Sequence, residues 1–394
     1  MDLNYSPEET AFRDEVRAWI DANLPTELRD KVLNYRELSK DDLLRWHKTL
    51  AQKGWIAPHW PKEWGGTDWT VVQRYIFEEE CGAAGAPPIV PFGVRMCAPV
   101  LLRFGTDAQK QRFLPRMYNG DDFWVQGYSE PGAGSDLASL KTRAVREGDH
   151  YVVTGQKIWT TLGHYGDWIF CLVRTDPKTE KRQDGISFLL VDMKSPGITV
   201  RPIVLLDQSR EVNEVFFDDV KVPAENLVHD ENKGWTVAKF LLGYERMGTG
   251  NIAVCKRELA RVKALAARAG LLDDTRFADR LTRVEIELMA LEITNLRYLD
   301  QLRGGRPPGA EVSLLKIKGT EIQQALTELM MQTAGPLAPI FRPVAPDAPF
   351  DAFTAALFPR YCNVRKATIY AGSNEIQRNI IAKATLGLGG GGAT

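Results

Sequence analysis

The sequence predicts an α+β protein with an N-terminal helical domain, a middle antiparallel β domain and a C-terminal four-helix bundle, at residues 1–121, 122–230 and 231–394. Two observations predict this order. Between residues 123 and 228, short runs rich in β-branched and aromatic residues alternate with Gly-Asp, Asp-Gly and Pro-Gly turns. The segments on either side carry apolar residues at helical spacing instead. A chain of 394 residues is long enough to bury a large core in such an arrangement.

The N-terminal region opens with a helix start signal. Ser6 is an N-cap residue, Pro7 suits the first helical position, and Glu9 supplies the reciprocal acceptor of a capping box. Apolar residues then recur at helical spacing, at Phe12, Val16, Trp19 and Ile20. Turn sequences at 61–66 and 84–91 interrupt the helical pattern. We therefore expect several helices up to about residue 120.

The middle region contains five short runs with strand character. These runs are residues 151–153, 168–173, 186–191, 198–203 and 215–217. A further strand is expected to end at Tyr128, just before a glycine-rich loop. Residues 222–226 read as the exit from this compact sheet domain.

The C-terminal region is helical again. One long pattern runs from Gly234 to about Gly270, a second from 273 to 302, and a third from 309 to about 333. A last helical stretch includes residues 377–384. Four long amphipathic segments predict a helical bundle.

Bulk properties exclude several classes of protein. A formal net charge of -1 gives no sign of attraction to nucleic acid or to a membrane surface. No run of 18 apolar residues predicts a spanning helix, and the N-terminus lacks the features of a signal peptide. The five cysteines are scattered, and the histidines show no metal-ligand spacing with them. We expect a cytoplasmic protein without a metal site.

Three segments carry the chemistry of the chain: residues 128–136 (YSEPGAGSD), 155–161 (GQKIWTT) and 369–377 (IYAGSNEIQ). Together they resemble the flavin loop, the Trp-x-Thr segment and the C-terminal motif of the acyl-CoA dehydrogenase family of flavoenzymes. The resemblance covers nearly the whole chain, and the family fold has the same order of helices, sheet and helices. It implies an enzyme that uses FAD to convert an acyl-CoA thioester to the trans-2-enoyl-CoA. A base removes the α-proton, and the flavin N5 accepts a hydride from the β-carbon.

The resemblance assigns the first segment to the flavin and to CoA. Tyr128 and Ser129 would lie along the flavin ring, and Ser135 would contact both the flavin phosphate and CoA. Small residues, Gly134 among them, would let the backbone approach these ligands. Taken alone, the segment reads as a Glu-Pro-Gly β-turn, and the match of the second segment favours the functional interpretation.

The second and third segments supply the remaining flavin contacts by the same resemblance. Trp159 would flank the ring and Thr161 would donate to N5, although an isolated Trp in a β domain is more often a core residue. Ser373 and Glu375 match positions at the nucleotide end of FAD. Ser373 also fits the N-cap of a helix, and both roles are compatible.

The catalytic base is the point at which the chain departs from the best-known members. Those members carry a glutamate where this chain has Ala371. Isovaleryl-CoA and long-chain dehydrogenases, and some bacterial relatives, instead carry a glutamate directly before an arginine on the first bundle helix. Glu245 and Arg246 match that pair, so Glu245 is the expected base and Arg246 supports the CoA region. A Glu-Arg pair on a helix is usually a solvated face, but here the flanking residues are apolar, which favours a raised carboxyl pKa.

The third segment keeps a function without a base. In the family, the backbone N–H at the position of Ala371 binds the thioester oxygen and stabilises the enolate-like charge. Ala371 and Gly372 are therefore expected to contact the substrate. Backbone chemistry of this kind survives a change of side chain.

Two segments that family subunits lend to their neighbour's FAD are eroded. Residues 267–274 lack the family's Phe-Gly, and 332–336 retain only part of a Gln-x-x-Gly-Gly segment. Similar erosion occurs in bacterial heteromeric members, and the overall pattern is similar to pimeloyl-CoA dehydrogenase large subunits. We expect a homo-oligomer or a heterotetramer with an unlike subunit, and an electron-transfer flavoprotein as acceptor. Two alternatives remain open: a flavin oxidase or monooxygenase of the same fold, and a non-catalytic partner subunit.

Overall fold

The computed structural model divides the chain into two compact units. The described residues are 4–244, 250–306, 309–338 and 352–388. A helical unit is formed by Met1–Asp42, Trp69–Pro87 and Arg246–Thr394. A sheet unit is formed by Leu43–Asp68 and Pro88–Glu245.

Two N-terminal helices of the helical unit begin at capping boxes. Ser6 caps α1 (Pro7–Asn23): its hydroxyl accepts from the Glu9 N–H at 3.2 Å, and its own N–H donates to the Glu9 carboxylate at 2.9 Å. The expected capping box is confirmed. A second capping box starts α4 (Val71–Ala84), which ends at Gly85 with φ 73°, within the predicted break. The short helix α2 (Thr26–Leu33) lies between them in sequence, and α3 (Lys40–Lys53) continues into the sheet unit.

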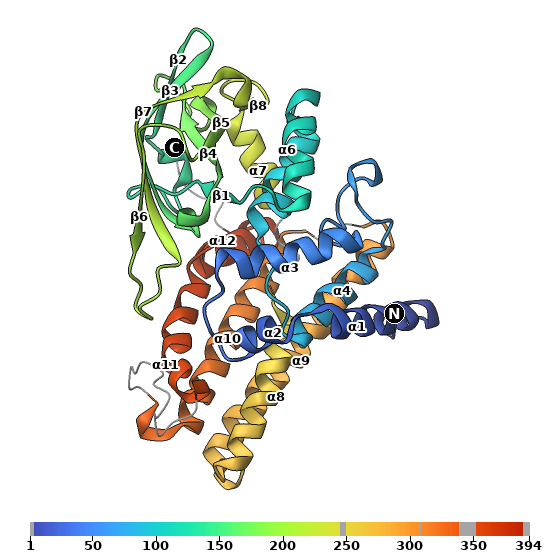
Figure 1. Ribbon diagram of the computed structural model, residues 1–394. Coiled ribbons are helices and arrows are strands. Elements are labelled where there is room, and N and C mark those ends of the chain that lie inside the picture. The colour runs from blue at the N-terminus through green and yellow to red at the C-terminus, as the bar shows by residue number, and fades with distance from the viewer. Residues whose placement is uncertain (1–3, 245–249, 307–308, 339–351, 389–394) are drawn as a thin grey trace. The chain divides into compact units, whose positions relative to one another are not determined.

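Four C-terminal helices share one apolar core. They are α8 (Ile252–Arg268), α9 (Thr275–Arg303), α10 (Ser313–Thr333) and α11 (Ala352–Val364). Leu315, Leu326 and Leu329 of α10 lie at its centre, each at most 1% exposed. The last helix, α12 (Asn374–Ala384), packs against α10 (Figure 1).

The structure corrects two expectations for this region. The single helix expected over 234–270 is wrong, because α7 (Gly234–Tyr244) ends before α8 begins, and Asn251 precedes α8 with φ 47°. Asn tolerates this left-handed conformation, which an α-helix cannot contain. The helix α11 was not expected, because Pro359 inside it interrupts the helical pattern.

The sheet unit is built on an eight-stranded sheet, with the order β6-β7-β3-β2-β4-β5-β8 and β1 paired to β4. The strands are β1 (Trp124–Gly127), β2 (Arg143–Glu147), β3 (His150–Thr161), β4 (Trp168–Arg174), β5 (Ile186–Asp192), β6 (Ile198–Ile203), β7 (Val212–Pro223) and β8 (Leu227–Val228). The five predicted runs all lie on strands. The expectation of a purely antiparallel sheet is corrected, because the sheet is mixed. The strand β1 runs parallel to β4, and β2 makes one parallel pairing with β4. The intervening hairpin gives the chain enough length to return for a parallel pairing.

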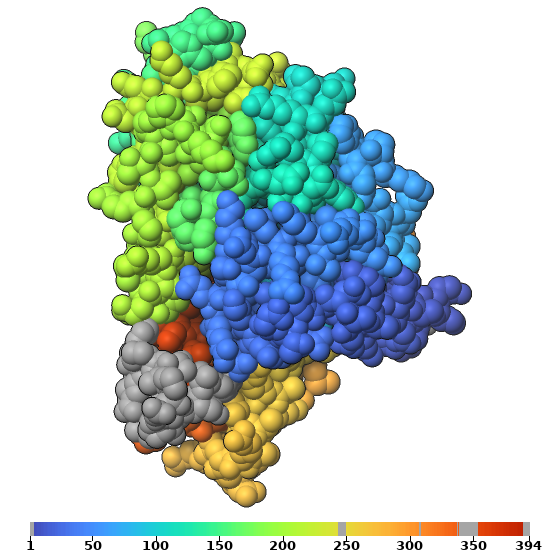
Figure 2. Space-filling view, viewed as in Figure 1, coloured from blue at the N-terminus to red at the C-terminus, as the bar shows by residue number. Residues whose placement is uncertain are grey.

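Helices of the same unit cover part of this sheet. The helices α5 (Ala98–Phe104), α6 (Asp107–Asn119) and α7 belong here, and α7 packs on β5 (Figure 1). Phe113 of α6 meets Trp124 and Trp168 edge to face, at centroid distances of 5.5 and 4.9 Å. The edge strand β6, drawn in yellow-green, lies on the face seen in Figure 2. No helix among the described residues is long and apolar enough to cross a membrane.

Candidate functional site

The loop at 128–136 follows directly from the end of β1. Tyr128 is buried, 6% exposed, and meets Phe170 of β4 edge to face at 5.8 Å. The Glu130 N–H donates to the Ala133 carbonyl at 2.9 Å, and the Ala133 N–H donates to the Glu130 carbonyl at 3.0 Å. The segment is therefore a closed turn, and it carries the expected ligand-binding residues on a defined backbone.

The two glycines of this turn face open space. A Cβ atom at Gly132 or Gly134 would meet no atom of the chain within 4 Å. Gly134 and Ser135 are both exposed. The turn therefore leaves room for a ligand to approach its backbone closely, as the expected phosphate and pantetheine contacts require.

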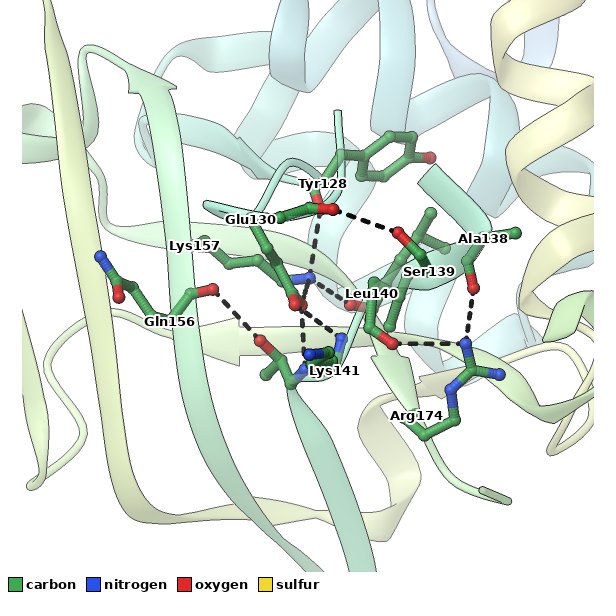
Figure 3. A network of polar contacts seen from close by, with 12 residues as sticks. Tyr128, Glu130, Ala138, Ser139, Leu140, Lys141, Gln156, Lys157 and Arg174 are labelled. Carbon is green, nitrogen blue, oxygen red and sulfur yellow. Dashed lines mark hydrogen bonds and ion pairs between the residues drawn. The ribbon is translucent and has the colours of Figure 1, made fainter. Parts of the chain in front are cut away.

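A buried ion pair ties the loop to the sheet. The ammonium of Lys157, on β3, is fully buried and lies 2.8 Å from the Glu130 carboxylate. It also donates to the carbonyls of Tyr128 at 3.2 Å and Leu172 at 2.7 Å. All three donors of the ammonium are thus engaged, as Figure 3 shows.

The carboxylate of Glu130 is equally well satisfied. It accepts the backbone N–H groups of Lys141 at 2.6 Å and Thr142 at 2.9 Å (Figure 3). Burial raises the pKa of Glu130, but the charge of Lys157 and the hydrogen bonds from Lys157, Thr142 and Lys141 outweigh it, so the pKa lies below the usual carboxyl value. Glu130 is therefore ionised at neutral pH and holds a structural position.

A backbone hydrogen bond brings the first and second segments together. The Ile158 N–H donates to the Ser129 carbonyl at 2.9 Å. The next residue, Trp159, has φ 61° and a side chain that is 55% exposed, at an irregularity in the pairing of β3 with β7. A left-handed tryptophan inside a strand is an uncommon conformation, and strain of this kind is concentrated at functional sites. Thr161, at the end of β3, is half-buried.

The loop after the turn is held by a second basic residue. Arg174, at the end of β4, donates to the carbonyls of Ala138 at 2.7 Å and Leu140 at 3.3 Å (Figure 3). Arg182 contributes an exposed ion pair to Asp136 at 3.4 Å. These contacts hold the chain after Ser135, and the Glu130–Lys157 pair holds it before Ser135.

The third segment lies in the helical unit and forms a tight turn before α12. Ala371 and Gly372 have φ values of 52° and 76°. The Gly372 carbonyl accepts from Lys316 of α10 at 2.7 Å and from the Gln377 amide at 3.4 Å. Both turn residues are exposed, and Tyr370 before them is 50% exposed.

Ser373 caps the helix that follows. Its hydroxyl accepts the Ile376 N–H at 3.3 Å, as expected for an N-cap. Asn374 is buried and exchanges hydrogen bonds of 3.1 and 3.2 Å with Thr320 of α10. Glu375 is exposed in the first turn of α12. The turn therefore has a fixed position on α10.

The structure groups the expected residues into two sets. Within the sheet unit it brings together the first and second segments, namely Tyr128, Ser129, Gly134, Ser135, Trp159 and Thr161. Within the helical unit it brings together Ala371, Gly372, Ser373 and Glu375. Glu245 and Arg246 lie outside the described residues. Their expected roles therefore stay predictions.

Sequence reasoning missed the anchoring roles of Glu130, Lys157, Arg174 and Lys316. The local sequence gave no signal for the burial of Lys157, which follows the polar Gln156 and lies outside the predicted run at 151–153. The partners themselves could not be identified from local sequence.

The residues of the sheet unit fit a large planar cofactor. They provide an exposed indole, a threonine at the end of the same strand and open space above two glycines. Tyr128, Ser129, Trp159 and Thr161 would hold its ring, while Gly134 and Ser135 would approach its phosphates. No metal cluster of His, Cys, Asp or Glu occurs among the described residues.

The chain matches three family models along its length. They are described as the N-terminal, middle and C-terminal domains of acyl-CoA dehydrogenase and match residues 6–121, 126–220 and 232–386. The protein called acyl-CoA dehydrogenase IpdE1 from Mycobacterium tuberculosis is 40% identical over 386 residues, 96% of this chain and 97% of that protein.

Solved structures give the same result. A structure titled "Tcur3481-Tcur3483 steroid ACAD" superposes with a TM-score of 0.87 at 31% identity, covering 98% of this chain and 99% of that one. The ChsE4-ChsE5 complex from Mycobacterium tuberculosis superposes with a TM-score of 0.83 at 34% identity, with the same coverage of 98% and 99%.

Proposed function

Because the chain belongs to the acyl-CoA dehydrogenase family of FAD-dependent oxidoreductases, we propose that it removes the α- and β-hydrogens of an acyl-CoA thioester to give the trans-2-enoyl-CoA. One observation carries the proposal. The loop at 128–136 and the strand segment at 157–161 are joined by the Glu130–Lys157 ion pair and by the Ile158–Ser129 hydrogen bond. The strand segment carries an exposed, left-handed Trp159, and the loop has open space at Gly132 and Gly134.

In this proposal, FAD supplies the hydride acceptor at N5. Tyr128 and Trp159 would contact the flavin ring, and the Thr161 hydroxyl would donate a hydrogen bond to it. Ser135 would bind phosphate and CoA from the open side of the turn. There, Gly132 and Gly134 have no side chain that could block a ligand. Ser373 and Glu375 serve the nucleotide end of FAD. Hydrogen bonds hold several of these segments, namely the Ser129 carbonyl to Ile158 and the Ser373 hydroxyl to Ile376, and this supports the precise orientation that such a role requires.

Glu245 is proposed as the base that removes the α-proton. The supporting observation is in the sequence: Ala371 has no carboxylate, and Glu245 stands before Arg246 among apolar neighbours. Desolvation raises the pKa of a carboxylate and makes it a more effective base near neutral pH. Arg246 is proposed to support the CoA side of the site.

The backbone at Ala371 is proposed to polarise the thioester. Its N–H would donate to the thioester oxygen and stabilise negative charge as the α-proton leaves. The left-handed turn at Ala371 and Gly372 exposes this backbone instead of enclosing it in a helix. Gly372 adds no side chain that could obstruct the thioester.

Similarity to named relatives supports a narrower proposal for the substrate class and the partners. One solved relative is titled a steroid ACAD, and another is a complex of two proteins. Each of the two matches covers 98% of this chain. We extend the proposal to a bulky, steroid-derived acyl group and to assembly with an unlike acyl-CoA dehydrogenase subunit. The proposed electron acceptor is an electron-transfer flavoprotein.

The proposal is tested by anaerobic titration of the purified protein, alone and with candidate partner subunits. The panel contains straight-chain, branched, dicarboxylic and steroid-side-chain acyl-CoAs, with CoA itself as the control. Bleaching of the flavin absorbance by an acyl-CoA, with formation of the enoyl-CoA, is the expected result. A protein that takes up no FAD under any of these conditions contradicts it. Formation of one hydrogen peroxide per substrate oxidised in air would instead favour the oxidase alternative. Flavin bleaching that persists in a complex whose Glu245 has been replaced would favour a non-catalytic partner subunit.

The most direct test of the proposed base is the substitution Glu245→Gln. The variant keeps the size of the side chain but loses its basicity, so flavin reduction should slow by about 10²- to 10⁴-fold while FAD and acyl-CoA still bind. Stopped-flow absorbance measures the reduction rate. Glu225→Gln, at an exposed carboxylate of the sheet unit, is the matched control and should reduce at the wild-type rate. Wild-type reduction by Glu245→Gln would place the base elsewhere.

A further inference from the structure

Lys316 is a buried cation that the proposed chemistry does not yet use. It lies on α10 with 4% of its surface exposed, and its ammonium donates to the Gly372 carbonyl at 2.7 Å. A lysine is rarely buried to this extent, because desolvation of the charge is unfavourable. The contact therefore links an unusual side chain to the turn that is proposed to bind the thioester.

The turn itself needs an external support. Ala371 has φ 52°, and a left-handed conformation is unfavourable for a residue with a Cβ. Such a conformation persists when the surrounding structure holds it in place. The Tyr370 N–H donates to the Lys366 carbonyl at 3.1 Å before the turn, and the Gln377 amide reaches the Gly372 carbonyl at only 3.4 Å. The bond from Lys316 is the shortest of these supports.

The helix that carries Lys316 is itself well fixed. Thr320, one turn later, is buried and pairs with Asn374 just after the turn. Gly319 packs directly on the backbone of Gly250, since an added Cβ would lie 2.6 Å from the Gly250 oxygen. Lys316 thus projects from a rigid support, and its position can determine that of the turn.

We propose that Lys316 is a positioning residue, which holds the 370–373 turn so that the Ala371 N–H points at the thioester oxygen and which adds positive charge beside the enolate that forms there. This inference rests on the proposed function of the turn. A charged donor forms hydrogen bonds roughly twice as strong as a neutral one, so the cation both fixes the Gly372 carbonyl and contributes to the local potential.

The charge state of Lys316 gives the proposal a pH signature. Burial lowers the pKa of Lys316 to about 8, and the negative charge of Glu375 in α12 opposes this shift. The ammonium is therefore charged below about pH 8 and loses its proton as the pH rises through that value. Proton abstraction from the thioester should decline over the same interval.

The test uses the FAD-loaded wild-type protein and variants in their native assembly. The probe is an acyl-CoA analogue with sulfur in place of the β-methylene, which can lose its α-proton but cannot transfer a hydride. Solvent deuterium exchange at the α-carbon, followed by mass spectrometry, reports enolisation alone. Binding affinity for the analogue, FAD content and thermal unfolding are measured in parallel.

Two variants and one control separate the roles of charge and structure. Lys316→Met removes both the charge and the donor, and Lys316→Gln keeps a neutral donor. Lys318→Met is the control, because Lys318 lies two residues away on α10 but pairs with Glu287 at 2.8 Å and Glu321 at 3.6 Å. We expect exchange to fall about 10- to 100-fold in Lys316→Met with little change in analogue affinity, a smaller loss in Lys316→Gln, and wild-type exchange in Lys318→Met.

The pH profile decides between positioning and a purely structural role. In the wild type, exchange should decline above about pH 8, and this limb should be absent in Lys316→Gln, which has no titrating group. Exchange at the wild-type rate in Lys316→Met, an equal loss in Lys318→Met, or an unchanged alkaline limb in Lys316→Gln would each overturn the assignment. If the wild-type protein exchanges no α-proton with any thioester, the proposed function fails and the role of Lys316 fails with it.

Discussion

Buried lysines anchor the 128–136 segment and the 369–377 segment of the candidate site, but they do so in different electrostatic settings. Lys157 of the sheet unit is fully buried and faces the carboxylate of Glu130 at 2.8 Å. Lys316 of the helical unit is 4% exposed and donates to a carbonyl, that of Gly372. Lys157 and Glu130 form an ion pair with no net charge. Lys316 instead donates to a carbonyl, so its positive charge is not cancelled by its hydrogen-bond partner.

The difference indicates which lysine serves stability and which serves chemistry. A paired and fully hydrogen-bonded charge such as Lys157 has its field largely cancelled by Glu130, so its main effect is to hold the loop on the sheet. A cation on a carbonyl keeps more of its field available to a nearby negative charge. Loss of Lys157 should therefore unfold or loosen the sheet unit, and loss of Lys316 should slow the reaction.

The largest expected effect comes from breaking the pair in the sheet unit. Lys157→Met leaves the Glu130 carboxylate buried without its cation, which typically destabilises a protein by about 3–5 kcal/mol. FAD retention should fall as well, because Ser129 and Trp159 lose their relative positions. Urea unfolding and flavin content after gel filtration measure these losses.

The control for this prediction is Lys141→Met. Lys141 binds Glu130 through its backbone N–H, and its side chain is exposed, so the substitution should leave stability within about 0.5 kcal/mol of wild type. The double variant Glu130→Gln with Lys157→Met should lose less than the sum of the single variants. Strict additivity would show that the two residues do not act as a pair.

A smaller effect is expected at the start of α12. Ser373→Ala removes the N-cap of this helix and should reduce stability by about 1 kcal/mol. Ser6→Ala removes the corresponding cap of α1 and should have a similar effect. If Ser373 also contacts FAD as proposed, affinity for FAD should weaken in Ser373→Ala alone. Equal FAD affinity in both variants would leave Ser373 with its capping role.

The smallest expected change in stability tests the strain in the turn at Ala371. Whether stability rises or falls is the informative result. Ala371→Gly removes the strain of the left-handed conformation, but it also raises the conformational entropy of the unfolded chain. The free energy of unfolding should therefore rise by at most about 1 kcal/mol. Ala367→Gly, in the helical turn just before, should instead lose stability. Urea unfolding of both variants gives the comparison. A loss in Ala371→Gly equal to that in Ala367→Gly would show that the turn carries no strain.

Much of the fold could be predicted because its signals are local. The capping box at Ser6, the break at Gly85 and the N-cap at Ser373 each depend on residues within a few positions of one another. The same holds for the strands of the middle region, whose alternation is visible in short windows. The first and second segments could also be assigned to one site, because both carry motifs of the same family.

The sequence by itself therefore determined the order of the helical and β regions and the family, and it proposed the candidate residues. Only the tertiary structure decided how those residues are held. Glu130 and Lys157 are 27 residues apart, and Lys316 and Gly372 are 56 apart, so no local pattern predicts that either pair meets. The break at Asn251 and the parallel pairing of β1 with β4 were likewise not predicted. The physical reason is that a buried charge, a strained backbone and a parallel strand pairing each depend on groups distant in the sequence, and folding alone brings those groups together.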